Sequence, residues 1–270
     1  APNVQRTYMV AGQPWTPRNG SRSRYGDMVT LKWGLAQSNN WISAYLMSNL
    51  SPQQFKDLLH VYGISNPDIH ASMALCLGPC EVSVSEMVSA YSTFVNHGIR
   101  TAPVFVSRIE DNEGNVIAEF QPRMNEVISA EAADKMLVLL QGVINDGTGR
   151  RIRNTYHIEG EIGGKTGTTN HHSDAWFIGF TPQLVTGCWV GGDDRDIHFE
   201  SMTYGQGSSM ALPIWALYMK KIYSDNTLDY SPDIKFNLPE GYDPCGRGKG
   251  GEGESNAKEF DGIDLEEVYE

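Results

Sequence analysis

The chain has few cysteines, an excess of acidic over basic residues and no long apolar run. Four cysteines in 270 residues are too few for a scaffold built on disulfides. No stretch of about 18 uninterrupted apolar residues occurs, so the sequence contains no candidate membrane-spanning helix. The 21 basic and 33 acidic residues give a net charge of −12, which argues against a nucleic-acid-binding surface. The length and a hydrophobic content of 40% fit a globular chain of one or two domains.

Candidate metal ligands are sparse. Cys76 and Cys80 form a single pair, whereas a structural zinc site would need a second pair, so two loop thiols or one disulfide are the alternatives. His171 and His172 are adjacent, and adjacent side chains in a strand or loop point in different directions, which disfavours a shared metal. We therefore expect neither a metal nor an organic cofactor.

Four stretches have the pattern of helices. Most begin at a capping residue, carry apolar residues at helical spacing and end near a glycine. The predicted helices are 52–62 after Ser51, 86–96 after Ser85, 130–146 after Ser129, and 210–223.

Other stretches, rich in β-branched and aromatic residues, predict strands at 104–109, 116–120, 175–180 and 184–190. Turn-forming residues at 111–115 and 181–183 join them into hairpins. Helices come first, then consecutive antiparallel strands beginning at a Lys-Thr-Gly motif, then a closing helix. This order predicts an α+β fold, in which an antiparallel β-sheet is flanked by helices. From residue 243 to residue 270 the composition is Gly-rich and acidic, and we expect a disordered tail there.

The stretch Gly163–Asn170 carries lysine, threonines and glycines in a pattern with two interpretations. A phosphate-binding loop would need a glycine at position 159 and a helix after the motif. Position 159 is Glu159, and the residues that follow, 175–180, have strand character. The alternative is the Lys-Thr-Gly strand of serine acyl-transferases that react with penicillin, formed here by Lys165, Thr166 and Gly167. The context favours this second interpretation.

A second motif, Ser38-Asn39-Asn40, interrupts an apolar helical pattern that runs from Leu31 to Leu46. A Ser-x-Asn triplet by itself is weak, because Ser224-Asp225-Asn226 also matches it and most such triplets are turns or caps. A polar break in an apolar helix, however, should cost stability unless it faces a cleft. The position of Ser38 therefore suggests a functional role.

Together the two motifs resemble two of the three signatures of penicillin-binding proteins and serine β-lactamases. The resemblance extends over about 15–223 and is closest to the transpeptidase domain of class A, bifunctional penicillin-binding proteins. It is carried by the segments Gly78–Ser83, Glu86–Gly98, Thr168–Asn170, Asp174–Pro182, Trp189–Gly191 and Ala211–Trp215.

This resemblance implies an enzyme at the periplasmic or outer face of the bacterial cytoplasmic membrane. Such an enzyme cross-links peptidoglycan stem peptides through an acyl-serine and binds β-lactam antibiotics. It implies that Ser38 relays a proton, that Asn40 holds the substrate amide, and that Lys165 supplies positive charge. Thr166, Gly167 and Thr168 are the implied substrate-binding residues, with the Thr168 backbone N–H as one half of an oxyanion hole.

The chain departs from the family at its nucleophile, which lies in a Ser-x-x-Lys motif upstream of Ser-x-Asn. The one match to Ser-x-x-Lys is Ser255–Lys258 in the acidic tail, which has no helical pattern. We therefore expect residues 1–242 to be a partial transpeptidase domain, incomplete on its N-terminal side and inactive by itself. The glycosyltransferase domain and membrane anchor of class A members would precede it, and the apolar surface left uncovered would favour self-association. Serine β-lactamases and non-catalytic penicillin-binding scaffolds or sensors are the alternatives.

Overall fold

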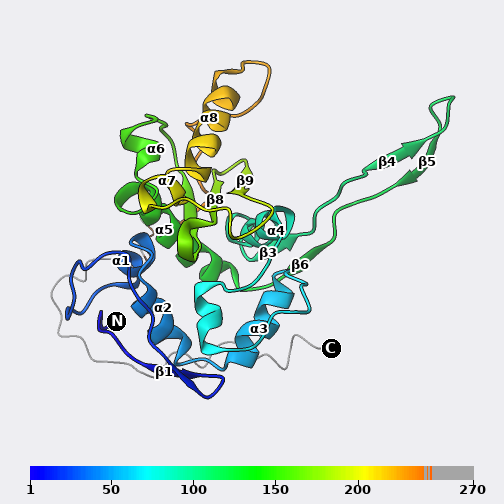
Figure 1. The fold of residues 1–270 in the computed structure, drawn as a ribbon. Coiled ribbons are helices and arrows are strands. Elements are labelled where there is room, and N and C mark those ends of the chain that lie inside the picture. Colours follow the sequence, from blue (N-terminus) through cyan, green and yellow to red (C-terminus); the bar gives the residue numbers. More distant parts are fainter. Residues whose placement is uncertain (240–241, 243, 245–270) are drawn as a thin grey trace.

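The computed structural model describes residues 1–239, 242 and 244, and Figure 1 shows its ribbon. The predicted tail, 243–270, lies outside the described residues except for Pro244. The helices, with two short 3-10 turns, are α1 (Leu31–Ala36), α2 (Asn40–Met47), α3 (Pro52–Val61), η1 (Met73–Leu77), α4 (Val84–Val95), α5 (Ala130–Asp146), α6 (Arg151–Asn154), η2 (Asn170–His172), α7 (Met202–Gly205) and α8 (Ala211–Ser224). The strands are β1 (Tyr8–Val10), β2 (Gln13–Trp15), β3 (Ile99–Thr101), β4 (Arg108–Glu110), β5 (Val116–Glu119), β6 (Met124–Glu126), β7 (Gly163–Thr168), β8 (Asp174–Phe180) and β9 (Val185–Gly191).

A three-stranded antiparallel sheet in the order β7-β8-β9 organises the core. Side chains alternate between the two faces of a strand, so Phe177 and Phe180 of β8 point to opposite sides. Phe177 packs against Trp215 of α8, with ring centroids 5.3 Å apart. Phe180 lies among residues of α4 and α5, including Tyr91 and Leu140. Helices therefore cover both faces of the sheet, which confirms the predicted α+β class.

The remaining strands form separate two-stranded pairs, β1-β2, β3-β6 and β4-β5. The β4-β5 hairpin projects away from the body of the molecule, whereas the helices α1 to α3 lie in the lower part of the view, below α4 and α5 (Figure 1). Between these strands the predicted turn at 111–115 is present: Asp111 Oδ1 accepts hydrogen bonds from the N–H groups of Glu113 and Asn115, each over 2.9 Å.

Two predicted boundaries were wrong by two residues or more. Helix α4 begins two residues earlier than predicted, because Ser83 rather than Ser85 is its N-cap. Ser83 Oγ accepts a hydrogen bond from the Glu86 N–H over 3.2 Å, and Glu86 Oε2 accepts one from the Ser83 N–H over 2.8 Å, which is a capping box. The strand predicted at 104–109 begins only at Arg108, so its apolar first residues are exposed loop.

Three of the four cysteines, Cys76, Cys80 and Cys188, are free thiols. The thiol alternative therefore holds for the Cys76 and Cys80 pair, and burial raises the pKa of the Cys76 thiol to about 11. No helix in the described part of the chain is long and apolar enough to cross a bilayer.

Candidate active site

The Lys-Thr-Gly motif lies on β7, which forms one edge of the three-stranded sheet. Close packing explains the two glycines that open this strand. A Cβ atom on Gly163 would lie 2.3 Å from the Phe180 ring, and one on Gly164 would lie 2.6 Å from the Ile178 carbonyl oxygen. An extended strand paired with β8 has no loop that could wrap a phosphate, and only the three-residue 3-10 turn η2, not an α-helix, lies between it and β8. The phosphate-loop interpretation is therefore wrong.

Ser38 lies in a turn between two helices rather than inside one. Helix α1 ends at Ala36, helix α2 begins at Asn40, and Ser38 has a φ of 51°. Asn39 caps α2, because its Oδ1 accepts hydrogen bonds from the N–H groups of Trp41 and Ile42 over 3.0 and 3.1 Å. The polar break seen in the sequence is thus a helix boundary, and it leaves Ser38 exposed.

The fold brings Ser38 and Lys165 together although 127 residues separate them. The Lys165 Nζ donates hydrogen bonds to Ser38 Oγ and to the Thr166 carbonyl oxygen, both over 2.8 Å. Burial disfavours the charged form of the amine and lowers the pKa of Lys165 to about 8. Because Ser38 Oγ accepts from Lys165, its own O–H proton remains available to a third group.

Asn40 is held by the segment that precedes α1. Its side-chain Nδ2 donates to the Arg18 carbonyl oxygen over 2.6 Å, and its backbone N–H donates to Asn19 Oδ1 over 2.7 Å. Asn40 is the first residue of α2, and its side-chain amide is hydrogen-bonded to the backbone of Arg18. Its predicted role in holding a substrate amide stays a prediction.

The two threonines of the motif also have protein partners. Thr166 is 8% exposed and shares a hydrogen bond with the Thr148 hydroxyl over 2.7 Å. Thr168 is exposed, and its Oγ1 accepts a hydrogen bond from the Gly207 N–H over 3.0 Å. Gly167 lies where a Cβ atom would come within 3.0 Å of the Trp176 Cβ. Substrate binding by these residues stays a prediction.

Sequence reasoning missed three residues that support this site, Asn19, Thr148 and Gly207. The pattern Asp146-Gly147-Thr148-Gly149 directly after a helix was a signal for Thr148, because two glycines around one threonine mark a tight turn. The Asn19-Gly20 dipeptide signals a turn, but nothing near Asn19 or Gly207 in the sequence indicates their contacts with Asn40 and Thr168.

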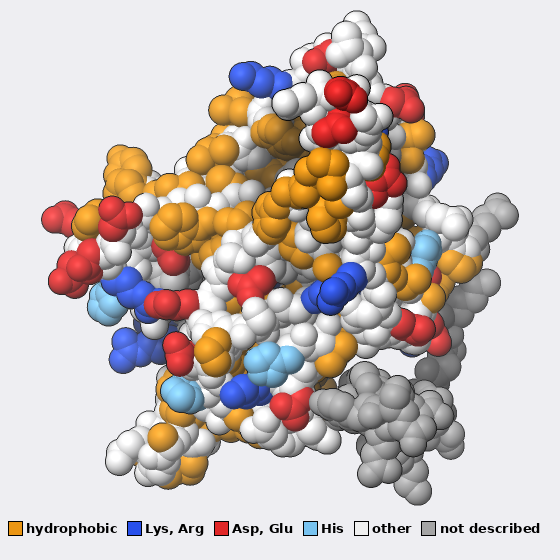
Figure 2. All heavy atoms as spheres, turned by 90° about the vertical axis from the view of Figure 1, so that its right-hand side faces the viewer, with side chains coloured by type: hydrophobic (Ala, Val, Ile, Leu, Met, Phe, Trp, Pro, Cys, Tyr) orange, Lys and Arg blue, Asp and Glu red, His pale blue; other side chains and the backbone are white. Residues whose placement is uncertain are grey.

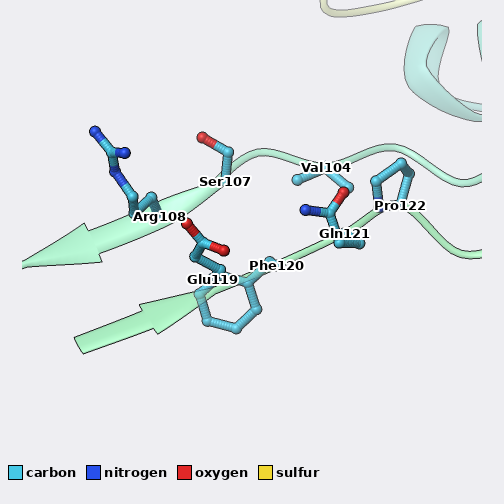
Figure 3. Close-up of a pocket in the computed structure, with 7 residues that line it drawn as sticks. All are labelled: Val104, Ser107, Arg108, Glu119, Phe120, Gln121 and Pro122. Carbon is cyan, nitrogen blue, oxygen red and sulfur yellow. The ribbon is translucent and has the colours of Figure 1, made fainter. Parts of the chain in front are cut away.

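Two other places in the fold carry polar side chains outside this site. His171 and His172 lie in η2 with φ near 60°, and the described residues contain no group of histidine, cysteine or acidic side chains arranged for a metal. An open pocket of about 520 Å³ lies at the base of the β4-β5 hairpin and is lined by Val104, Ser107, Arg108, Glu119, Phe120, Gln121 and Pro122 (Figure 3). Neither Ser38 nor Lys165 lines that pocket.

The family model described as the penicillin binding protein transpeptidase domain matches residues 3–190. The chain is 36% identical over 228 residues to penicillin-binding protein 1A of Aquifex aeolicus, a match covering 84% of this chain and 30% of that protein. It is 32% identical over 215 residues to penicillin-binding protein 1A of Neisseria meningitidis, covering 77% of this chain and 26% of that protein. The chain therefore spans less than a third of the length of these relatives.

Solved structures agree with the sequence matches. Penicillin-binding protein 1A from Haemophilus influenzae superposes with a TM-score of 0.77 at 28% identity, covering 88% of this chain and 40% of that one. The PonA1 protein from Mycobacterium tuberculosis, solved in complex with penicillin V, shares the fold with a TM-score of 0.66 at 22% identity, covering 85% and 65%. The chain belongs to the penicillin-binding protein transpeptidase family, and it is homologous to class A members over the transpeptidase region.

Proposed function

We propose that these residues form the Ser-x-Asn and Lys-Thr-Gly half of a peptidoglycan D,D-transpeptidase site. The main support for this proposal is the hydrogen bond from Lys165 Nζ to Ser38 Oγ over 2.8 Å. This bond brings the side chains of the two motifs together at the edge of the sheet. The substrates are peptidoglycan stem peptides, and β-lactam antibiotics acylate the same site. Asn40, Thr166, Gly167 and Thr168 complete the substrate-binding part of this half-site.

In the proposed reaction a serine Oγ attacks the carbonyl carbon of the penultimate D-Ala and forms an acyl-serine, and the proton of its hydroxyl passes to the neutral Lys165 amine. The C–N bond to the terminal D-Ala breaks, and the leaving nitrogen takes the Ser38 hydroxyl proton, while Lys165 returns a proton to Ser38 Oγ. A pKa of about 8 suits Lys165 to give and regain a proton near neutral pH. An amine of a neighbouring stem peptide then attacks the acyl carbon, the C–O bond to the serine breaks, and the proton that the amine loses returns to the serine Oγ.

The nucleophilic serine would come from a Ser-x-x-Lys helix in a longer polypeptide that contains these residues. The match at Ser255–Lys258 lies in the stretch with no helical pattern. A glycosyltransferase domain and a membrane anchor upstream, with the catalytic domain on the outer face of the cytoplasmic membrane, belong to the same proposal. They are supported by the similarity to penicillin-binding protein 1A of Aquifex aeolicus, of which this chain spans 30%.

Labelled penicillin tests the proposal. The 270-residue chain is expected to form no covalent adduct detectable by intact mass spectrometry, whereas the longer polypeptide with Ser-x-x-Lys is expected to be acylated. In that polypeptide Lys165→Ala should slow acylation about 100-fold or more, by analogy with removal of one preorganised catalytic donor. Lys220→Ala, which changes an exposed lysine on α8, is the matched control.

Unchanged acylation of the Lys165→Ala variant would refute the proposed role of the half-site. Rapid hydrolysis of the acyl-enzyme would instead indicate a serine β-lactamase. A longer polypeptide that binds no label despite an intact fold would indicate a non-catalytic scaffold or sensor.

A further inference from the structure

The turn between α5 and α6 lies against both halves of the proposed site. The Thr148 N–H donates a hydrogen bond to the Ala36 carbonyl oxygen over 3.0 Å, two residues before Ser38. The Gln37 Nε2 donates to the Asp146 carbonyl oxygen over 3.0 Å. On its other side, the Thr148 hydroxyl shares a hydrogen bond with Thr166 over 2.7 Å, next to Lys165. The turn therefore connects the end of α1 to β7.

The packing between this turn and α1 leaves no free space. A Cβ atom on Gly147 would lie 2.2 Å from the Ala36 carbonyl oxygen and 2.8 Å from its carbonyl carbon. Gly147 is itself buried and directly precedes Thr148. Because these contacts are to backbone atoms, a displacement of the turn would move the residues that lead into Ser38.

The hydroxyl of Thr148 matters separately from its bulk. Thr166 is almost fully buried, and a buried hydroxyl without a partner is costly. Thr148 supplies that partner from outside the sheet. Without it, the Thr166 side chain would have to rotate or β7 would have to shift, and either change occurs one residue from Lys165.

We propose that Thr148 is a positioning residue: its backbone holds the end of α1, its hydroxyl holds Thr166, and together they keep Ser38 Oγ within hydrogen-bond distance of Lys165 Nζ. This inference rests on the proposed function, because the Ser38 and Lys165 pair that Thr148 supports is the pair to which that function assigns proton transfer. Thr148 takes no part in the chemistry itself.

The distance between position 38 and Lys165 can be tested in the 270-residue chain, because the test needs no nucleophilic serine. A thiol at position 38 makes the effect of the Lys165 charge measurable. In a Ser38→Cys variant the nearby Lys165 ammonium should stabilise the thiolate, which is the reactive form. Alkylation by iodoacetamide between pH 6 and 9, followed by peptide mass spectrometry, measures the reaction at position 38 separately from the native cysteines. Adding Lys165→Met should slow alkylation at pH 7 by about 10-fold, which corresponds to one pKa unit of the thiol.

The matched pair at position 148 separates the hydroxyl from packing. Thr148→Val keeps the branched shape but loses the hydroxyl, whereas Thr148→Ser keeps the hydroxyl but loses a methyl group. In the Ser38→Cys background we expect Thr148→Val to slow alkylation at pH 7 by about 3- to 10-fold, a large part of the Lys165→Met effect, and Thr148→Ser to remain within about 2-fold. Circular dichroism and thermal melting of each variant check the fold.

If Thr148→Val does not fold, Thr166→Val breaks the same hydrogen bond from the other side and should give the same slowing. The inference is overturned if alkylation in Thr148→Val equals that of the parent while Lys165→Met slows it, or if Thr148→Ser is slowed as much as Thr148→Val. If Lys165→Met leaves the alkylation rate unchanged, the Ser38 and Lys165 pair itself is refuted and, with it, the basis of the proposed function.

Discussion

The Lys165 amine donates a hydrogen bond to Ser38 Oγ over 2.8 Å, across 127 residues of sequence. One partner lies on an edge strand and the other in a turn between two helices. A sheet and a helical layer therefore each contribute one side of the proposed site, and the site depends on how these layers pack.

The pH dependence of stability should reveal the lowered pKa of the half-buried Lys165. Its pKa is about 8 in the folded chain and about 10.4 for an unperturbed lysine, so between these values the unfolded chain binds more protons. The free energy of unfolding of the parent, relative to Lys165→Met, should therefore rise as the pH increases from about 8 to about 10.4. Urea unfolding at several pH values measures this difference. A difference that is constant over the window would contradict the lowered pKa.

Glu86 should stabilise the chain through its ionised form. Burial opposes ionisation, but hydrogen bonds from Ser65 and Ser83 outweigh it and lower the pKa of Glu86 to about 2. We expect Glu86→Gln to reduce the free energy of unfolding at pH 7 by about 1 to 2 kcal/mol. The loss should shrink as the pH falls from about 4.5 to about 2, because the parent carboxylate is then protonated. Urea unfolding at pH 7 and pH 3 tests this, and an equal loss at both would count against it.

Phe177 should be essential to the layer between the sheet and α8. Its side chain is fully buried against Trp215, so Phe177→Ala should lower the free energy of unfolding by about 3 to 5 kcal/mol. Phe105, which is 85% exposed, offers a matched control, and Phe105→Ala should change stability by less than about 0.5 kcal/mol. Chemical denaturation compares the two variants, and similar losses would show that the described packing is wrong.

Gly147 should not tolerate a side chain. In Gly147→Ala the new methyl group would overlap the Ala36 backbone, and we expect a loss of about 1 to 3 kcal/mol in unfolding free energy. At Gly20 a Cβ atom would meet only the Met202 Cε at 3.9 Å, so Gly20→Ala should be nearly neutral. Thermal melting of both variants is the measurement, and equal melting temperatures would contradict the close approach of the α5-α6 turn to α1.

The chain should self-associate through exposed apolar surface. Large apolar side chains are exposed along and beside the projecting hairpin, and Figure 2 shows hydrophobic side chains spread over the face from which the hairpin projects. Phe105 and Ile117 are 85% and 66% exposed, and contiguous apolar surface favours association. Analytical ultracentrifugation should show a weight-average mass that rises with concentration, and Phe105→Ser with Ile117→Ser should reduce the rise. A monomer at every concentration would disprove the expectation.

Local patterns in the sequence predicted most elements of the fold. Helix α3 begins at Pro52, directly after its N-cap Ser51, as predicted. Helix α5 ends directly before Gly147, also as predicted. The start of α4 was misplaced because Ser83 and Ser85 are both plausible caps, and only the reciprocal hydrogen bonds of Glu86 distinguish them. The apolar pattern around Ser38 likewise could not show that the helix breaks there.

The sequence by itself determined the family resemblance, the residue types of both motifs and the strand composition of 175–180, because these depend on neighbours along the chain. Only the tertiary structure decided that Lys165 meets Ser38, that Thr166 pairs with Thr148, and that Asn40 is tied to residues 18–19. Each of these contacts joins residues from different elements. They form as the layers pack and bring polar groups within hydrogen-bond distance, and a linear pattern carries no record of which distant group supplies the partner.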